Sequence, residues 1–368
     1  MYNELSFAPE KEHVDVKSMD EALDAVKTFK TKPQKVSLKD ITVSLNGGAN
    51  LKVDEEGISK PQVMKMTQWS LQSLCRFLGI PDPFARKIPI DLLQKNISRL
   101  LQEKREDFVS LLIGKENEIV NIVKANYKPF ENEKLLSKLN TLFNNGKSIE
   151  WESMRVGSRG FDLNVVDLSI KPLEPKVGDI TKIGFRIINS DTGFRDATAK
   201  VYLFRLACTN GATLTDDWGI VRRNANRNIS YERDLEYFAN GVQNLRVNFD
   251  RLKTVYDKMP ETFLTDFQVE GVWKAINRVA GPEQADAVIE KDEEGRKAVL
   301  HLVAAKRAHN RQLFVEALKE PEATDVNAYN THNRITDASK QYKWQDALRM
   351  QSIGGRMISM LVENLNEN

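Results

Sequence analysis

The sequence predicts an α+β protein: a central antiparallel β-meander backed by a long amphipathic helix, with helical N- and C-terminal regions. Three β-rich stretches follow one another in the middle of the chain, separated by short links that contain Pro, Gly or Asp. Consecutive strands with short links most simply pair antiparallel. A long run of apolar residues at steps of three and four then follows, which is typical of a helix with one buried face.

The N-terminal part divides into an arm, residues 1–35, and a mixed α/β region, residues 36–147. Strand-like alternation is broken by turn residues at Asn46-Gly47-Gly48, and Thr67 or Ser70 can cap a helix that ends at Gly79. The periodicity predicts helices near 19–30, 67–79, 90–104 and 133–143, and strands within 36–53, 108–113 and 118–123.

The central region, residues 148–260, carries the sheet and its helix. Strand candidates are Trp151–Ile170, Asp179–Asn189 and Ala197–Cys208, and Ser230 is a candidate N-cap for one helix that ends at Pro260. Residues 261–368 are predicted to be helical, carried by 272–279, 295–317 and 342–365.

Charge and composition exclude several classes of protein. The 54 basic and 52 acidic side chains nearly cancel, which excludes a histone-like polycation. No apolar stretch is long enough to span a bilayer and the first residues lack a secretory pattern, so we expect no membrane partner and a location in the cytoplasm of a bacterial host. Nucleotide-binding and zinc-binding motifs are absent, so we expect no cofactor.

Basic charge is concentrated between Thr181 and Arg233, where nine positive residues face five negative ones. Cations along a sheet and its following loop can track a phosphate backbone, and Trp218 among them can stack on an unpaired base. The residues predicted to contact nucleic acid are Lys182, Arg186, Asn189, Arg195, Lys200, Arg205, Asn210, Trp218, Arg222, Arg223 and Arg227.

Each of these features also has a purely structural interpretation. Asn189 and Asn210 stand in Asn/Gly-rich corners, where turn formation explains them equally well. Tyr202 and Phe204 flank Leu203 on a strand candidate and are expected to pack in the core. An alternative chemistry is a divalent metal held by the aspartates of these corners, Asp191, Asp196, Asp216 and Asp217.

The same corners carry a family resemblance. The run Arg205-Leu206-Ala207-Cys208-Thr209-Asn210-Gly211, preceded by Asn189-Ser190-Asp191-Thr192-Gly193, resembles the signature of a phage- and plasmid-borne domain family of unknown function. The stretches 78–89 and 327–336 also resemble parts of that family. The resemblance implies an origin on a mobile element and supplies little mechanism.

The predicted function is that of a phage- or plasmid-encoded single-stranded DNA-binding protein in replication or recombination, with strand annealing as an extension. Three antiparallel strands followed by a long helix resemble the layout of phage single-strand annealing proteins, which implies a homo-oligomer. The alternatives are a metal-dependent enzyme that acts on nucleic acid through the aspartate-rich corners, and a non-enzymatic structural or host-interaction protein of a mobile element. Non-catalytic binding is the favoured interpretation, because no catalytic signature is present.

Overall fold

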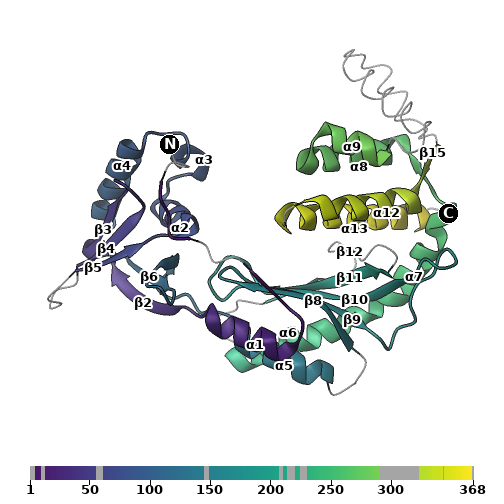
Figure 1. The fold of residues 1–368 in the computed structure, drawn as a ribbon, viewed down its shortest axis with the longest axis horizontal. Helices are drawn as coiled ribbons and strands as arrows, with labels where there is room; N and C mark the ends of the chain where they lie inside the picture. The colour runs from purple at the N-terminus through teal and green to yellow at the C-terminus, as the bar shows by residue number, and fades with distance from the viewer. Residues whose placement is uncertain are drawn as a thin grey trace, which may run out of the picture. The chain divides into compact units, whose positions relative to one another are not determined.

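The computed structural model describes residues 5–9, 13–54, 61–144, 149–206, 210–213, 220–223, 230–289, 323–342 and 344–366. These residues fall into two compact units, each assembled from separate stretches of chain. Unit 1 comprises Met1–Thr141, Ser153–Leu163 and Ile188–Ala197, and unit 2 comprises Leu142–Glu152, Asn164–Ile187 and Thr198–Asn368. The α+β class is confirmed (Figure 1).

The main sheet has seven strands in the order β1-β8-β9-β10-β11-β12, with β13 paired to β11. Strands β8 to β11 follow chain order, which is the predicted meander. Its strands are β1 (Val14–Val16), β8 (Ile149–Gly157), β9 (Gly160–Asp167), β10 (Thr181–Asn189), β11 (Thr198–Arg205), β12 (Asn210–Thr213) and β13 (Ile220–Arg222).

The predicted strand Trp151–Ile170 is wrong as one element, because it is the hairpin β8–β9. The chain turns at Ser158-Arg159, and Gly160 follows with φ +113°. A Cβ on Gly160 would lie 1.9 Å from the carbonyl oxygen of Asn189, so glycine is required by both conformation and space. The turn therefore brings the β8–β9 connection against the end of β10.

Unit 1 contains two three-stranded sheets, in the orders β2-β6-β7 and β3-β4-β5. Thr67 caps α2 through a hydrogen bond from the Ser70 N–H, and Gly79 ends the helix in the left-handed conformation, as the sequence predicts. The elements are α1 (Met19–Thr28), β2 (Lys32–Ser37), β3 (Ile41–Ser44), β4 (Asn50–Val53), β5 (Gln62–Lys65), α2 (Gln68–Leu78), α3 (Asp82–Ala85), α4 (Ile90–Glu103), β6 (Phe108–Ile113), β7 (Ile119–Lys124) and α5 (Asn132–Asn144), with a 3₁₀ turn at Leu38–Asp40.

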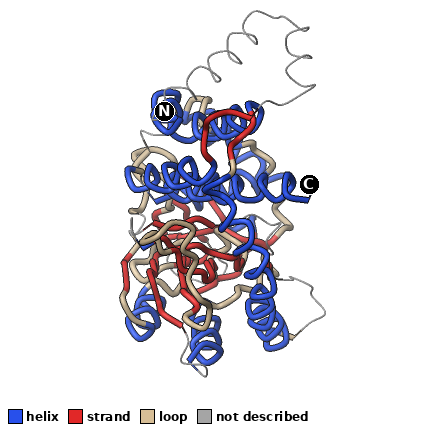
Figure 2. The backbone as a smooth tube through the Cα atoms, turned by 90° about the vertical axis from the view of Figure 1, so that its right-hand side faces the viewer, coloured by secondary structure: helices blue, strands red, loops and turns tan. Residues whose placement is uncertain are grey.

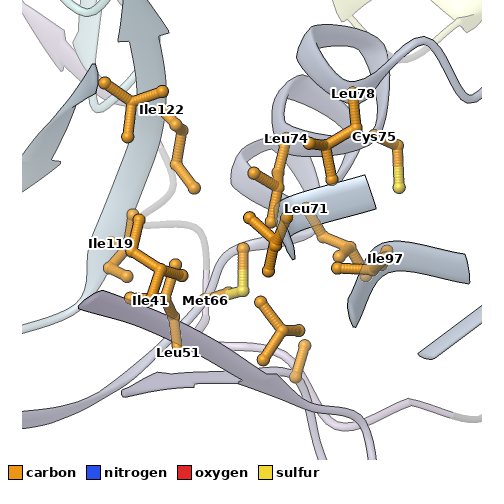
Figure 3. Packing of buried hydrophobic residues seen from close by; sticks show 14 of the residues in the cluster. Ile41, Leu51, Met66, Leu71, Leu74, Cys75, Leu78, Ile97, Ile119 and Ile122 are labelled. Atoms are coloured by element: carbon orange, nitrogen blue, oxygen red, sulfur yellow. The ribbon is translucent and has the colours of Figure 1, made fainter. Parts of the chain in front are cut away.

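The core of unit 1 lies between these sheets and the apolar faces of α2 and α4 (Figure 3). Leu71, Leu74 and Leu78 of α2 are buried, as the three- and four-residue spacing predicts. Cys75 lies in the same core, and burial raises the pKa of its thiol to about 12, so it serves as a small apolar residue.

Unit 2 covers β10 with helices on both faces. Phe185 packs against Phe249 of α7 (Phe249–Lys258), with the ring centroids 5.6 Å apart, while Arg186 of the opposite face lies beside Gln351 of α13 (Trp344–Asn366). Figure 1 shows α12 (Ala328–Ala338) and α13 on one side of the strands and α7 on the other. The sheet of unit 2 is therefore sandwiched, whereas the sequence predicts only one covering helix.

Two further predictions for unit 2 need correction. The helix Ser230–Met259 begins at the predicted cap but consists of α6 (Tyr231–Asn244), a 3₁₀ segment (Leu245–Asn248) and α7. The C-terminal region also contains a short antiparallel pair, β14 (Phe263–Thr265) with β15 (Ala323–Asn327), drawn in red in Figure 2. The remaining elements are 3₁₀ turns at Met259–Glu261 and Ser339–Gln341, α8 (Asp266–Ala280) and α9 (Pro282–Ile289), while the predicted helix 295–317 lies outside the described residues.

The tight approach at Gly160 gives a first prediction. Gly160→Ala should lower the free energy of unfolding by more than about 2 kcal/mol, because the new Cβ collides with backbone that cannot move aside. Gly47→Ala is the matched control, since Gly47 also has positive φ, +71°, but open space around it. It should cost only about 1 kcal/mol. Urea denaturation measures both, and equal losses would contradict the steric argument.

Candidate functional site

Lys182 and Arg186, predicted on an open sheet face, lie under the second helical layer of unit 2. Lys182 forms an ion pair with Glu150 at 2.8 Å, and Arg186 is only 4% exposed. This face of β10 is therefore not an open track for a phosphate backbone.

The predicted arginines further along the chain differ in exposure. Arg205 at the end of β11 donates from Nε and Nη2 to the carboxylate of Asp179, at 2.5 and 2.6 Å. Arg223 pairs with the buried Asp234 at 2.7 Å, while Arg222 is exposed and Lys200 is partly buried. Asn210 lies opposite Arg205 in the β11–β12 pairing. Trp218 and Arg227 lie outside the described residues, as do Cys208, Asp216 and Asp217.

The corner that follows β10, residues 189–193, is built into the interior of unit 1. The amide Nδ2 of Asn189 donates to the carbonyl of Phe130 at 2.6 Å and to Oδ1 of Asn132 at 2.8 Å. Thr192 accepts at its carbonyl from Asn121 Nδ2 at 2.6 Å. Asn189 and Thr192 are buried, so turn formation, the structural alternative, accounts for the Asn189 side chain in this structure.

This corner presents Phe194 and Arg195 to a cluster that the charge count does not reveal. The guanidinium carbons of Arg159 and Arg195 lie 4.7 and 5.4 Å from the centroid of the Phe194 ring. Trp69 meets the same ring edge-on, with centroids 4.7 Å apart, and Arg76 lies over the Trp69 indole at 4.9 Å. We call Trp69, Arg76, Arg159, Phe194 and Arg195 the arginine–aromatic cluster.

Local structure positions every member of this cluster in unit 1. Trp69 and Arg76 are seven residues apart on α2, two helical turns, so they share a face of the helix. Arg159 occupies the β8–β9 turn that Gly160 permits. The Phe194 N–H donates to Ser190 Oγ at 3.0 Å, which fixes the exit from the corner. All five side chains are partly or fully exposed, in contrast to the buried corner beneath them.

The polar groups of the cluster are all hydrogen-bond donors. Three guanidinium groups carry fork-shaped N–H donors, and the Trp69 indole Nε1 has no acceptor among the described residues. A guanidinium held over an aromatic face keeps its edge N–H groups for a planar or tetrahedral anion. The cluster is therefore suited to an acceptor-rich anionic ligand such as a phosphodiester.

Unit 2 holds a second polar assembly, which is buried. The Tyr329 hydroxyl donates to Asp179, beside Arg205, and Tyr256 shares a hydrogen bond with Thr181 at 3.2 Å. Burial opposes ionisation of Asp179, but hydrogen bonds from Arg205 and Tyr329 outweigh it and lower its pKa. This assembly joins Arg205 of the predicted motif to the 327–336 segment.

The tyrosines and histidine of this assembly are held in their neutral forms. Burial raises the pKa of Tyr256 to about 12 and also raises that of Tyr329, and it lowers the pKa of His332 to about 4 against the opposing hydrogen bond from Nδ1–H to the Gly354 carbonyl. Neutral tyrosines and a neutral buried imidazole are poor nucleophiles and bases, so the assembly is structural.

The corner aspartates do not gather with other ligands. Among the residues that the structure describes, no group of three His, Cys, Asp or Glu side chains could hold a metal ion. Two of the four aspartates in the metal hypothesis, Asp216 and Asp217, fall outside those residues. Over the same described ranges, no helix has the length and apolarity needed to cross a bilayer.

Comparison with known proteins identifies the family. The family described as Domain of unknown function (DUF932) matches residues 120–349, more than half of the chain, and the protein belongs to it. No curated protein and no solved structure matches the chain. Arg159, Phe194 and Arg195 lie inside the matched range, whereas Trp69 and Arg76 precede it.

The buried pair Arg223–Asp234 gives a second prediction. Arg223→Ala should lower the free energy of unfolding by about 3 kcal/mol, because it leaves the Asp234 carboxylate buried without its cation. The double variant Arg223→Ala/Asp234→Asn should recover part of that loss, measured by urea denaturation. A single variant as stable as the wild type would show that the pair contributes nothing.

The pKa values of His332 and Asp191 give a third prediction, with opposite signs. His332 is neutral when folded, so protonation of the unfolded chain should remove on the order of 3 kcal/mol as the pH falls from 6.5 to about 4. Burial raises the pKa of Asp191 to about 6, so its contribution grows as the pH falls from 6 towards 4.

Variants separate the two groups in thermal melts at pH 7, 5.5 and 4.5. Asp191→Asn should make the chain more acid-sensitive than the wild type, and His332→Asn should make it less so. The same pH dependence in all three proteins would contradict both assignments.

Proposed function

We propose that this protein binds single-stranded nucleic acid through the arginine–aromatic cluster of unit 1, without catalysis. The observation that carries the proposal is the placement of three guanidinium groups over the rings of Phe194 and Trp69. Cations beside aromatic rings are the combination that single-strand-binding proteins use, because phosphates meet the cations and bases can stack on rings.

The proposal changes the residues predicted from the sequence. Arg195 stays in the interface, and Arg222 remains an exposed cation of unit 2. Asn189 and Arg186 leave it because they are buried, and Arg205 and Arg223 leave it because each is paired with a carboxylate. Phe194, Arg159, Trp69 and Arg76 enter the interface.

A biological setting completes the proposal. The signature around 189–211 supports an origin on a phage or plasmid, where a single-strand-binding protein serves replication or recombination. Strand annealing without a nucleotide motif requires many weak sites that act together, so the proposal includes a homo-oligomer.

A paired substitution tests the interface. Arg159→Ala/Arg195→Ala should weaken binding of a labelled oligo(dT) by at least tenfold, and the log–log salt slope should fall by about 1.4, or roughly 0.7 for each lost phosphate contact. Arg86→Ala/Arg99→Ala removes the same charge from exposed arginines elsewhere in unit 1 and should change neither quantity. Fluorescence anisotropy at several salt concentrations measures both.

Two further arms make the result decisive. Arg159→Lys/Arg195→Lys keeps the charge but loses the guanidinium plane, and should recover only part of the affinity. Product analysis with Mg²⁺ reports any cleavage, which would favour the metal-dependent alternative. A folded double-alanine variant with unchanged affinity and salt slope would overturn the proposed interface.

A further inference from the structure

A second cation–aromatic pair lies in unit 1, on the sheet β2-β6-β7. Phe108 begins β6 and is 49% exposed, which is unusual for a large apolar side chain. Lys35 of β2 places its Nζ 4.9 Å from the centroid of the Phe108 ring. An exposed aromatic ring beside a lysine has the same chemistry as the arginine–aromatic cluster.

The strand register places this pair on one face of the sheet. Phe108 pairs with Ser37, and Lys35 pairs with Ser110, which in turn pairs with Val123 of β7. Opposed residues and residues two apart share a face of an antiparallel sheet. Lys35, Phe108 and Val123 therefore share one face, while Val36 and Val109 point to the opposite face, into the core.

The same face carries the corner that presents Phe194 and Arg195. Asn121, two residues before Val123, donates to the Thr192 carbonyl, and a Cβ on Gly193 would lie 3.3 Å from Val123 Cγ1. Two strand spacings separate Val123 on β7 from Lys35 on β2, roughly 10 Å. The corner and the Lys35–Phe108 pair thus lie on a common surface.

We propose that Lys35 and Phe108 form a second anchor for the same single strand, which crosses the sheet β2-β6-β7 from the arginine–aromatic cluster to the Phe108 ring. This inference rests on the proposed function and adds the path and extent of the ligand. Phe108 stacks a base and Lys35 neutralises a phosphate, so the anchor is independent of sequence. A strand must be long enough to reach from one anchor to the other.

Oligonucleotide length separates the two anchors. We expect Lys35→Ala/Phe108→Ala to weaken binding of an oligo(dT) of about 20 nucleotides by tenfold or more, and to leave an oligo(dT) of about 4 nucleotides unaffected, since stacking of one base carries that much affinity. Arg159→Ala/Arg195→Ala should weaken binding of both lengths.

Matched variants exclude a loss of fold or of charge. Lys32→Ala removes the same charge from the same strand, three residues from Lys35 and therefore on the opposite face, and should change neither affinity. Phe108→Leu keeps an apolar side chain without the aromatic ring, and should lose affinity for the long strand with an unchanged melting temperature.

The outcomes distinguish this inference from the proposed function. Unchanged affinity of Lys35→Ala/Phe108→Ala for the long strand, with a loss in Arg159→Ala/Arg195→Ala, overturns the second anchor alone. An equal loss for both lengths in Lys35→Ala/Phe108→Ala also overturns it, because the two pairs would then form one short site. Full affinity in Arg159→Ala/Arg195→Ala overturns the proposed function itself.

Discussion

The amide of Asn189 is the contact on which the rest of the candidate interface depends. Its two donors bind the carbonyl of Phe130 and the side chain of Asn132, and so tie the end of β10 to the start of α5. Buried amide donors are costly when unpaired, so this arrangement strongly favours one path for the corner. With that path fixed, Phe194 leaves the corner at the position where Arg159, Arg195 and Trp69 meet its ring.

Buried polar contacts hold unit 2 in a comparable way. Asp179 accepts from both Arg205 and Tyr329, which joins the start of the β10 segment, the end of β11 and helix α12. Because each partner is largely buried, a single unpaired member would be more costly than the pair is favourable. Arg205, the first residue of the Arg-x-x-Cys-Thr-Asn-Gly run, thus serves the architecture of the fold.

The two motif corners therefore perform different tasks from those that their composition indicates. Asn and Arg in loops are typical of ligand contacts and of turns alike, and residue type alone does not separate the two. In this protein the polar side chains of the first corner point inward, and the residues that follow it, Phe194 and Arg195, remain partly exposed. The surface chemistry begins one residue after the motif ends.

The sequence by itself determined the α+β class, the meander, and the caps at Thr67 and Ser230, because periodicity, turn residues and capping act over a few positions. It also determined that Tyr202 and Phe204 are core residues. Only the tertiary structure decided which cations stay at the surface. Arg186 is covered by α13, more than 150 residues later, and Trp69 and Arg76 join Phe194 from more than 100 residues earlier. Contacts between residues so far apart leave no local periodicity, so they depend on how the elements pack.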